Sequence, residues 1–146
     1  MITAPIADDL IDRCLASLTD ELRRAPWRGD PNQLAGHCYV ASEALYHALG
    51  GRDGGWRPMR VGMLWHGQIC THWFLTGPRR EILDVTAAQF DEVPRFRGMS
   101  GAYLDARGCG FLTAYPSRRA RIVLARMGLI SPDRSADLHW EIPACC

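Results

Sequence analysis

Three residue types that together support nucleophilic catalysis occur in order through the middle of the chain: Cys38, His72 and Asp84. A cysteine thiolate attacks a carbonyl carbon, a histidine takes up and returns the thiol proton, and a carboxylate orients the histidine. The cysteine precedes the histidine by 34 residues, and the histidine precedes the aspartate by 12. The sequence therefore predicts a cysteine-dependent acyl-transfer site, provided that the fold brings these side chains together.

Acyl transfer also needs hydrogen-bond donors for the oxyanion that forms on the attacked carbonyl. The backbone N–H of Cys38 is one candidate donor. The side-chain amides of Asn32 and Gln33, six and five residues before the cysteine, are others, and Gln33 is preferred for its reach. Three further residues are expected to line the substrate cleft: His37, Cys70 and Trp73.

Apolar residues at helical spacing predict three helices, at 7–24, 38–49 and 117–128. Gly50 and Gly128 lie where a left-handed residue would end the second and third helices. The second helix starts at the nucleophilic cysteine. A thiolate in that position is stabilised by the positive end of the helix dipole.

Between the second and third helices, the alternation of side chains predicts three strands, at 59–65, 69–75 and 81–85. The connectors are short and contain glycine or proline, which favours antiparallel hairpins. Helices followed by an antiparallel sheet and a closing helix indicate the α+β class.

The second hairpin is expected to bring the histidine and the aspartate together. If Thr76 lies opposite Arg80, then His72 lies opposite Asp84. Directly opposed Cβ atoms on antiparallel strands are about 4.5–5.5 Å apart. In that register Asp84 could hold one ring nitrogen of His72 while the other faces the cysteine.

The chain has 146 residues, 47% of them hydrophobic, which is typical of a single globular domain. We expect a core at 32–90, an irregular wall or lid at 91–110 and a loosely held tail from residue 131. No apolar stretch approaches a membrane span, and the N-terminus has no signal-peptide pattern. The expected location is therefore cytoplasmic, with the six cysteines as free thiols.

The blocks "GHCYVASEALYHALG", "THWFL" and "ILDVTAAQF" resemble the transglutaminase-like branch of the papain-like cysteine enzyme superfamily. They also look similar to small proteins encoded by bacteriophages and bacteria, and a phage origin would place the action in the host cytosol. The resemblance covers residues 32–90. It implies a helix that carries the cysteine, packed on a small antiparallel sheet that carries the histidine and the aspartate. It also implies amide hydrolysis, deamidation or transamidation of a protein or peptide substrate, without a cofactor.

Other functions remain open at this stage. A non-catalytic interaction protein could retain the same fold, and the oligomeric state is not indicated. Two cysteines and two histidines could instead form a tetrahedral zinc site: His37, Cys38, Cys70 and His72. The net charge of +1 argues against nucleic acid as a partner, and the arginines of the last helix are more typical of a solvated face.

Overall fold

The computed structural model describes residues 4–65, 67–90 and 101–132. The longer helices are α1 (Ala4–Ser17), α2 (Cys38–Ala48) and α4 (Arg118–Arg126), with a short α3 (Gly101–Leu104). The strands are β1 (Arg57–Trp65), β2 (Gln68–Thr76), β3 (Ile82–Leu83) and β4 (Arg107–Gly108). Single 3₁₀ turns occur at η1 (Asp20–Leu22), η2 (Ala25–Trp27), η3 (Gly51–Gly54) and η4 (Ala87–Gln89). The fold is α+β, as the order of patterns in the sequence predicts.

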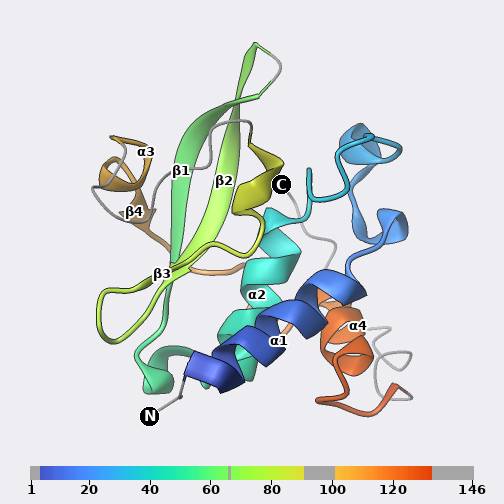
Figure 1. The fold of residues 1–146 in the computed structure, drawn as a ribbon, viewed down its shortest axis with the longest axis vertical. Helices are drawn as coiled ribbons and strands as arrows, with labels where there is room; N and C mark the ends of the chain where they lie inside the picture. Colours follow the sequence, from blue (N-terminus) through green and yellow to red (C-terminus); the bar gives the residue numbers. More distant parts are fainter. Residues whose placement is uncertain (1–3, 66, 91–100, 133–146) are drawn as a thin grey trace.

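The four strands form one antiparallel sheet in the order β3-β2-β1-β4. The long hairpin of β1 and β2 stands above the gathered helices α1, α2 and α4 (Figure 1). Strand β4 was not expected from the sequence, because two residues in a glycine-rich segment show no periodicity. It pairs with β1 at Met59 and Arg60.

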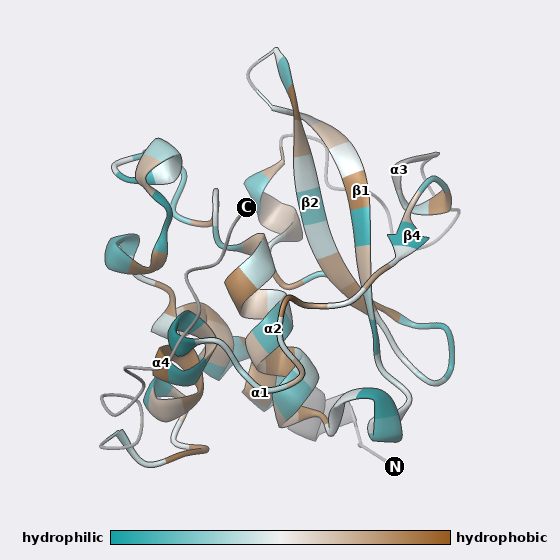
Figure 2. Ribbon diagram, turned by 180° about the vertical axis from the view of Figure 1, so that it is seen from behind, coloured by the Kyte–Doolittle hydropathy of each residue, from teal (hydrophilic) through white to brown (hydrophobic). Residues whose placement is uncertain are grey.

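Two apolar clusters lie against β2. The larger one joins α1, α2 and α4 to the strand through buried residues that include Cys14, Leu45, Leu75 and Val123. The smaller one contains Val61, Phe74 and Tyr103. Because neighbouring residues of a strand point to opposite faces, Phe74 and Leu75 serve different clusters. Apolar residues concentrate where the three helices adjoin, whereas the loop between β2 and β3 is hydrophilic (Figure 2).

The first helix is shorter than the predicted span of 7–24, since α1 ends at Ser17. The Ser17 hydroxyl donates to the Arg13 carbonyl at 2.7 Å, and Arg126 from α4 donates to the Ser17 carbonyl at 2.9 Å. A side chain from a distant helix thus satisfies a terminal carbonyl. Leu22 continues the apolar pattern from η1 and is 1% exposed. The apolar pattern therefore predicts the burial of Leu22 correctly, but its prediction that the α-helix extends to this residue is wrong.

The predicted register of the second hairpin is wrong by two residues. Leu75 pairs with Leu83 and Thr76 with Ile82, so His72 is not directly opposite Asp84. The turn is longer than expected, because the Gly77 N–H donates to the Glu81 carbonyl at 2.9 Å. A slip of two residues keeps every side chain on its expected face.

Residues 91–100 of the expected lid and residues 133–146 of the expected tail, with Cys145 and Cys146, lie outside the described residues. The second half of the expected irregular segment, 101–110, contains α3 and β4. Within the described part of the chain, no helix is both long enough and apolar enough to span a membrane.

Candidate active site

His72 is the centre of a buried polar cluster. Its side chain is 2% exposed, and its Nε2 lies 2.7 Å from Oδ2 of Asp84. The Cys38 side chain is close enough to the same imidazole to raise its pKa, and both residues line one cavity. The structure therefore brings together the three side chains that the sequence singles out.

The cluster forms at an open edge of the sheet. β3 pairs with β2 only at Leu75 and Thr76, so the rest of β2 has no strand on that side within the described residues. The first turn of α2 approaches β2 there, and Cys38 Sγ lies 3.9 Å from the Thr71 carbonyl oxygen. Asp84 directly follows β3 and reaches His72 diagonally rather than from the opposite position.

The surroundings of His72 favour its charged form. Burial of the ring disfavours the imidazolium, but the hydrogen bonds and negative charges of Asp84 and Cys38 outweigh burial. Together they raise the pKa of His72 to about 9. The contacts with Asp84 and Cys38 therefore favour the imidazolium over the neutral ring.

Asp84 is held by a second donor that the sequence does not reveal. The Tyr103 hydroxyl donates to the same Oδ2 atom at 2.7 Å, and burial together with the Asp84 charge raises the pKa of Tyr103. The other oxygen, Oδ1, is buried and has no hydrogen-bond partner among the described residues. A carboxylate with one unsatisfied oxygen depends on the positive imidazolium beside it. Tyr103 comes from α3, in a segment without an apolar period, so no sequence signal identified it.

Gln89 is a further site residue that the sequence analysis missed. Its Nε2 lies 3.3 Å from Nδ1 of His72 and 3.0 Å from the hydroxyl of Thr86. Gln89 is 5% exposed, at the end of η4. It lies in the same sequence block as Asp84, three residues after Thr86, but no motif or spacing in the sequence distinguishes it.

Cys38 occupies the first position of α2. Its amide N–H therefore has no carbonyl acceptor within the helix, and the N–H groups at this end of a helix are suited to binding an anion. The side chain is partly exposed. A substrate can thus reach the sulfur, which a buried packing cysteine would not allow.

Cys38 and His72 line a cavity of about 340 Å³. Its walls are mainly aromatic and apolar, with Trp27, Trp65, Trp73, Phe90, Met63 and Val40. Cys70 and Trp73 line this cavity, which is the position expected for them. Trp73 is held by ring contacts with Tyr39 and Phe111, at centroid distances of 4.8 and 5.7 Å.

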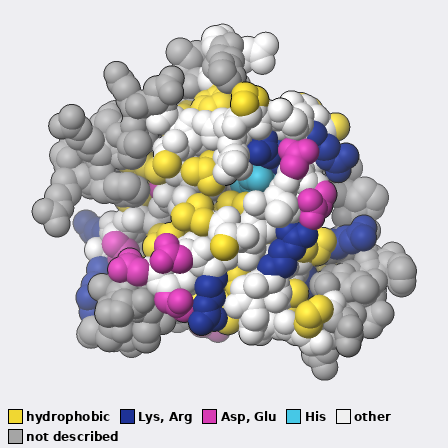
Figure 3. All heavy atoms as spheres, turned by 45° about the vertical axis from the view of Figure 1, so that its right-hand side comes forward, with side chains coloured by type: hydrophobic (Ala, Val, Ile, Leu, Met, Phe, Trp, Pro, Cys, Tyr) yellow, Lys and Arg dark blue, Asp and Glu magenta, His cyan; other side chains and the backbone are white. Residues whose placement is uncertain are grey.

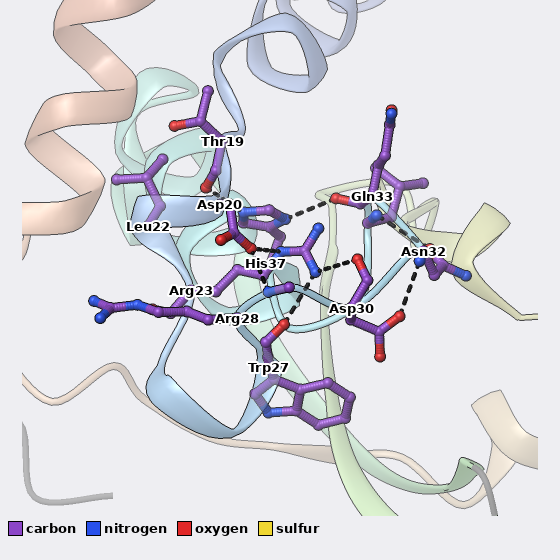
Figure 4. Close-up of polar contacts among 12 residues, drawn as sticks. Thr19, Asp20, Leu22, Arg23, Trp27, Arg28, Asp30, Asn32, Gln33 and His37 are labelled. Carbon is purple, nitrogen blue, oxygen red and sulfur yellow. Dashed lines mark hydrogen bonds and ion pairs between the residues drawn. The ribbon is translucent and has the colours of Figure 1, made fainter.

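His37, by contrast, lies outside the cavity. It is fully buried, with Nε2 at 2.9 Å from the Thr19 carbonyl and Nδ1 at 3.1 Å from the Gln33 carbonyl (Figure 4). Burial lowers the pKa of His37. The expectation that His37 lines the cleft is wrong, because its ring ties the loop before α2 to the end of the first helical segment.

The two amides expected to bind the oxyanion are not brought to the cavity either. The Asn32 amide donates to the Gln89 carbonyl at 2.9 Å, and its oxygen accepts from the Leu34 N–H. Gln33 is exposed and contributes its backbone carbonyl to His37. Both residues stabilise the loop that leads to Cys38, and neither lines the cavity.

The alternative zinc site is not supported by the geometry. Both ring nitrogens of His37 face backbone carbonyls, and Nε2 of His72 faces Asp84. In the part of the chain that the structure describes, no three His, Cys, Asp or Glu side chains converge as metal ligands.

Comparisons of this chain with family models, with curated proteins and with solved structures find no match.

Proposed function

We propose that this protein is a cysteine-dependent acyl-transfer enzyme with a papain- or transglutaminase-like core, acting on an amide or ester carbonyl. One observation carries the proposal: a buried imidazole hydrogen-bonds with a carboxylate and lines the same cavity as a partly exposed cysteine at the start of a helix. A merely structural cysteine does not need a charged histidine beside it.

The mechanism follows from the different roles of the two ring nitrogens of His72. Asp84 holds Nε2 of His72, which leaves Nδ1 to exchange a proton with Cys38. The thiolate attacks the carbonyl carbon, and the Cys38 N–H at the start of α2 stabilises the oxyanion. The proton on Nδ1 passes to the leaving amine or alcohol as the carbon–heteroatom bond breaks. Water or a second amine then resolves the thioester.

Gln89 is placed to act on the same proton. A neutral His72 protonated on Nε2 would accept a hydrogen bond at Nδ1 from the Gln89 amide, whereas the imidazolium would donate toward the sulfur. Gln89 therefore stabilises the ring after its proton has left. We assign it a positioning role, and a protein or peptide amide is the substrate class that we propose.

The reactivity of individual thiols tests the proposal. At neutral pH we expect iodoacetamide to alkylate one thiol at least tenfold faster than the others, and the Cys38→Ala variant to lose this fast phase. Cys70→Ala is the matched control, because Cys70 lines the same cavity but is not among the groups that raise the His72 pKa. Cys14 should not contribute, since it is fully buried and burial raises its pKa to about 12.

Mass spectrometry of candidate peptides incubated with wild type and with Cys38→Ala identifies the reaction. A mass increase of about one dalton would indicate deamidation, and new termini would indicate proteolysis. Slow, uniform alkylation of all exposed thiols would contradict the enzyme and favour a non-catalytic interaction protein.

A further inference from the structure

Two arginines from opposite ends of the chain line the cavity that contains Cys38. Arg24 immediately precedes η2, and Arg119 is the second residue of α4. Nη1 of Arg119 donates to the Leu22 carbonyl at 2.8 Å, which fixes its guanidinium. Arginine side chains lie beside exposed apolar groups on the face shown in Figure 3.

These cations are only partly compensated. Among the residues that the structure describes, Arg24 forms no hydrogen bond or ion pair through its side chain. Arg24 and Arg119 place two like charges in one cavity. Burial, followed by the charge of Arg24, lowers the pKa of Arg119. The carboxylate of Glu43 opposes this effect, but both of its oxygens accept hydrogen bonds from Ser117.

A bound anion would relieve this repulsion. Guanidinium groups present paired donors that match a carboxylate or a phosphate, and they bind more strongly where water is partly excluded. The neighbouring walls are the indole and phenyl rings of Trp27, Trp73 and Phe90, which suit an apolar group. Arg119 and Cys38 line the same cavity, so an anionic group held by the guanidinium can belong to a substrate that reaches the sulfur.

We infer that the cavity binds the acyl part of the amide substrate, and that this part is apolar and carries an anionic group, a carboxylate or a phosphate ester, which Arg24 and Arg119 hold. This inference rests on the proposed acyl-transfer function and names the substrate class. The apolar part occupies the aromatic walls, and the anionic group fixes the carbonyl relative to Cys38.

Binding to the Cys38→Ala protein tests this without requiring turnover. We expect 3-phenylpropionate to bind at least tenfold more tightly than neutral 3-phenylpropanamide, measured by calorimetry or by tryptophan fluorescence. Arg24→Gln should remove most of this preference, while Arg24→Lys should retain part of it because the charge remains. Phenyl phosphate in a parallel titration shows whether a phosphate or a carboxylate fits better.

Arg79→Gln is the matched control, because Arg79 is exposed in the turn before β3 and does not line the cavity. Equal affinities for the acid and the amide, no binding of either, or a preference that persists in both Arg24→Gln and Arg119→Gln would overturn the inference. Fast alkylation of Cys38 in wild type, combined with any of these results, would leave the acyl-transfer function standing. If wild type shows no fast alkylation of Cys38 but the acid still binds more tightly than the amide, the acyl-transfer function is rejected and the anion site is retained.

Discussion

Replacing Asp84 with asparagine removes the charge beside His72 while keeping a hydrogen-bond acceptor for Nε2. The side-chain volume is nearly unchanged, and the buried position, 7% exposed, stays filled. The substitution therefore isolates the electrostatic effect of Asp84 on the imidazole. It should change how the stability of the protein depends on pH.

The magnitude follows from the pKa of His72, which rises from 6.5 to about 9 on folding. A group with a raised folded-state pKa contributes stability that is fully present below its unfolded pKa and is lost as the pH rises through the folded value. This proton contributes roughly 2–3 kcal/mol at pH 7 and less than about 1 kcal/mol at pH 9. Without the Asp84 charge, burial disfavours the imidazolium, so most of this contribution should disappear.

The assay is urea unfolding under reducing conditions, followed through the fluorescence of the five tryptophans at several values between pH 6 and pH 9. We expect the difference in unfolding free energy between wild type and Asp84→Asn to shrink by about 2 kcal/mol from pH 7 to pH 9. Comparing the two proteins at each pH cancels the titration of cysteines and tyrosines that they share.

Asp53→Asn is the control, since this exposed carboxylate in η3 changes the net charge by the same amount. Its pH profile should follow that of wild type. A difference between wild type and Asp84→Asn that stays constant from pH 7 to pH 9 would refute the assignment of the His72 charge to Asp84.

Two further substitutions test the elements that position the site. Ser117→Ala removes both the N-cap of α4 and the hydroxyl that donates to buried Glu43 at 2.6 Å. We expect the free energy of unfolding in urea to fall by about 2 kcal/mol. A decrease below about 0.5 kcal/mol would contradict this expectation. Gly36→Ala would place a Cβ 2.5 Å from Cβ of Trp27 at φ +80°, whereas Gly29→Ala, at φ +79°, meets nothing within 4 Å. In the same assay we expect the free energy of unfolding to fall by about 1 kcal/mol for Gly29→Ala and by at least twice as much for Gly36→Ala. Equal decreases in the two variants would show that the contact with Trp27 does not matter for stability.

The apolar periods of the sequence predict the main helices and strands well. The helix expected at 38–49 is α2 at Cys38–Ala48, and Gly50 adopts the expected left-handed conformation at φ +93°. These features depend on local chemistry, namely side-chain spacing and the freedom of glycine at positive φ. The end of α1 was not predictable in this way, because it depends on a hydrogen bond from a helix more than 100 residues away.

The positions of the site residues could be predicted from the sequence for those on or directly after strands but not for those in a loop. His72 and Asp84 meet although their register was predicted incorrectly, because a slip of two residues preserves the face of the sheet and leaves the side chains within diagonal reach. Asn32 and Gln33 have suitable side chains and suitable spacing, yet the loop that contains them turns away from the cavity. Loop conformation depends on distant partners, here Thr19 and Gln89.

The sequence by itself determined the α+β class, the helix that begins at Cys38, and the face of β2 on which His72 lies, since each follows from residue spacing over a few turns or strand positions. Only the tertiary structure decided that Tyr103 and Gln89 belong to the cluster, that His37 is a structural residue, and that Arg24 and Arg119 share a cavity with the cysteine. The physical reason is that these residues come from segments between 14 and 95 residues apart, and their geometry depends on how the helices and the sheet pack rather than on any local period.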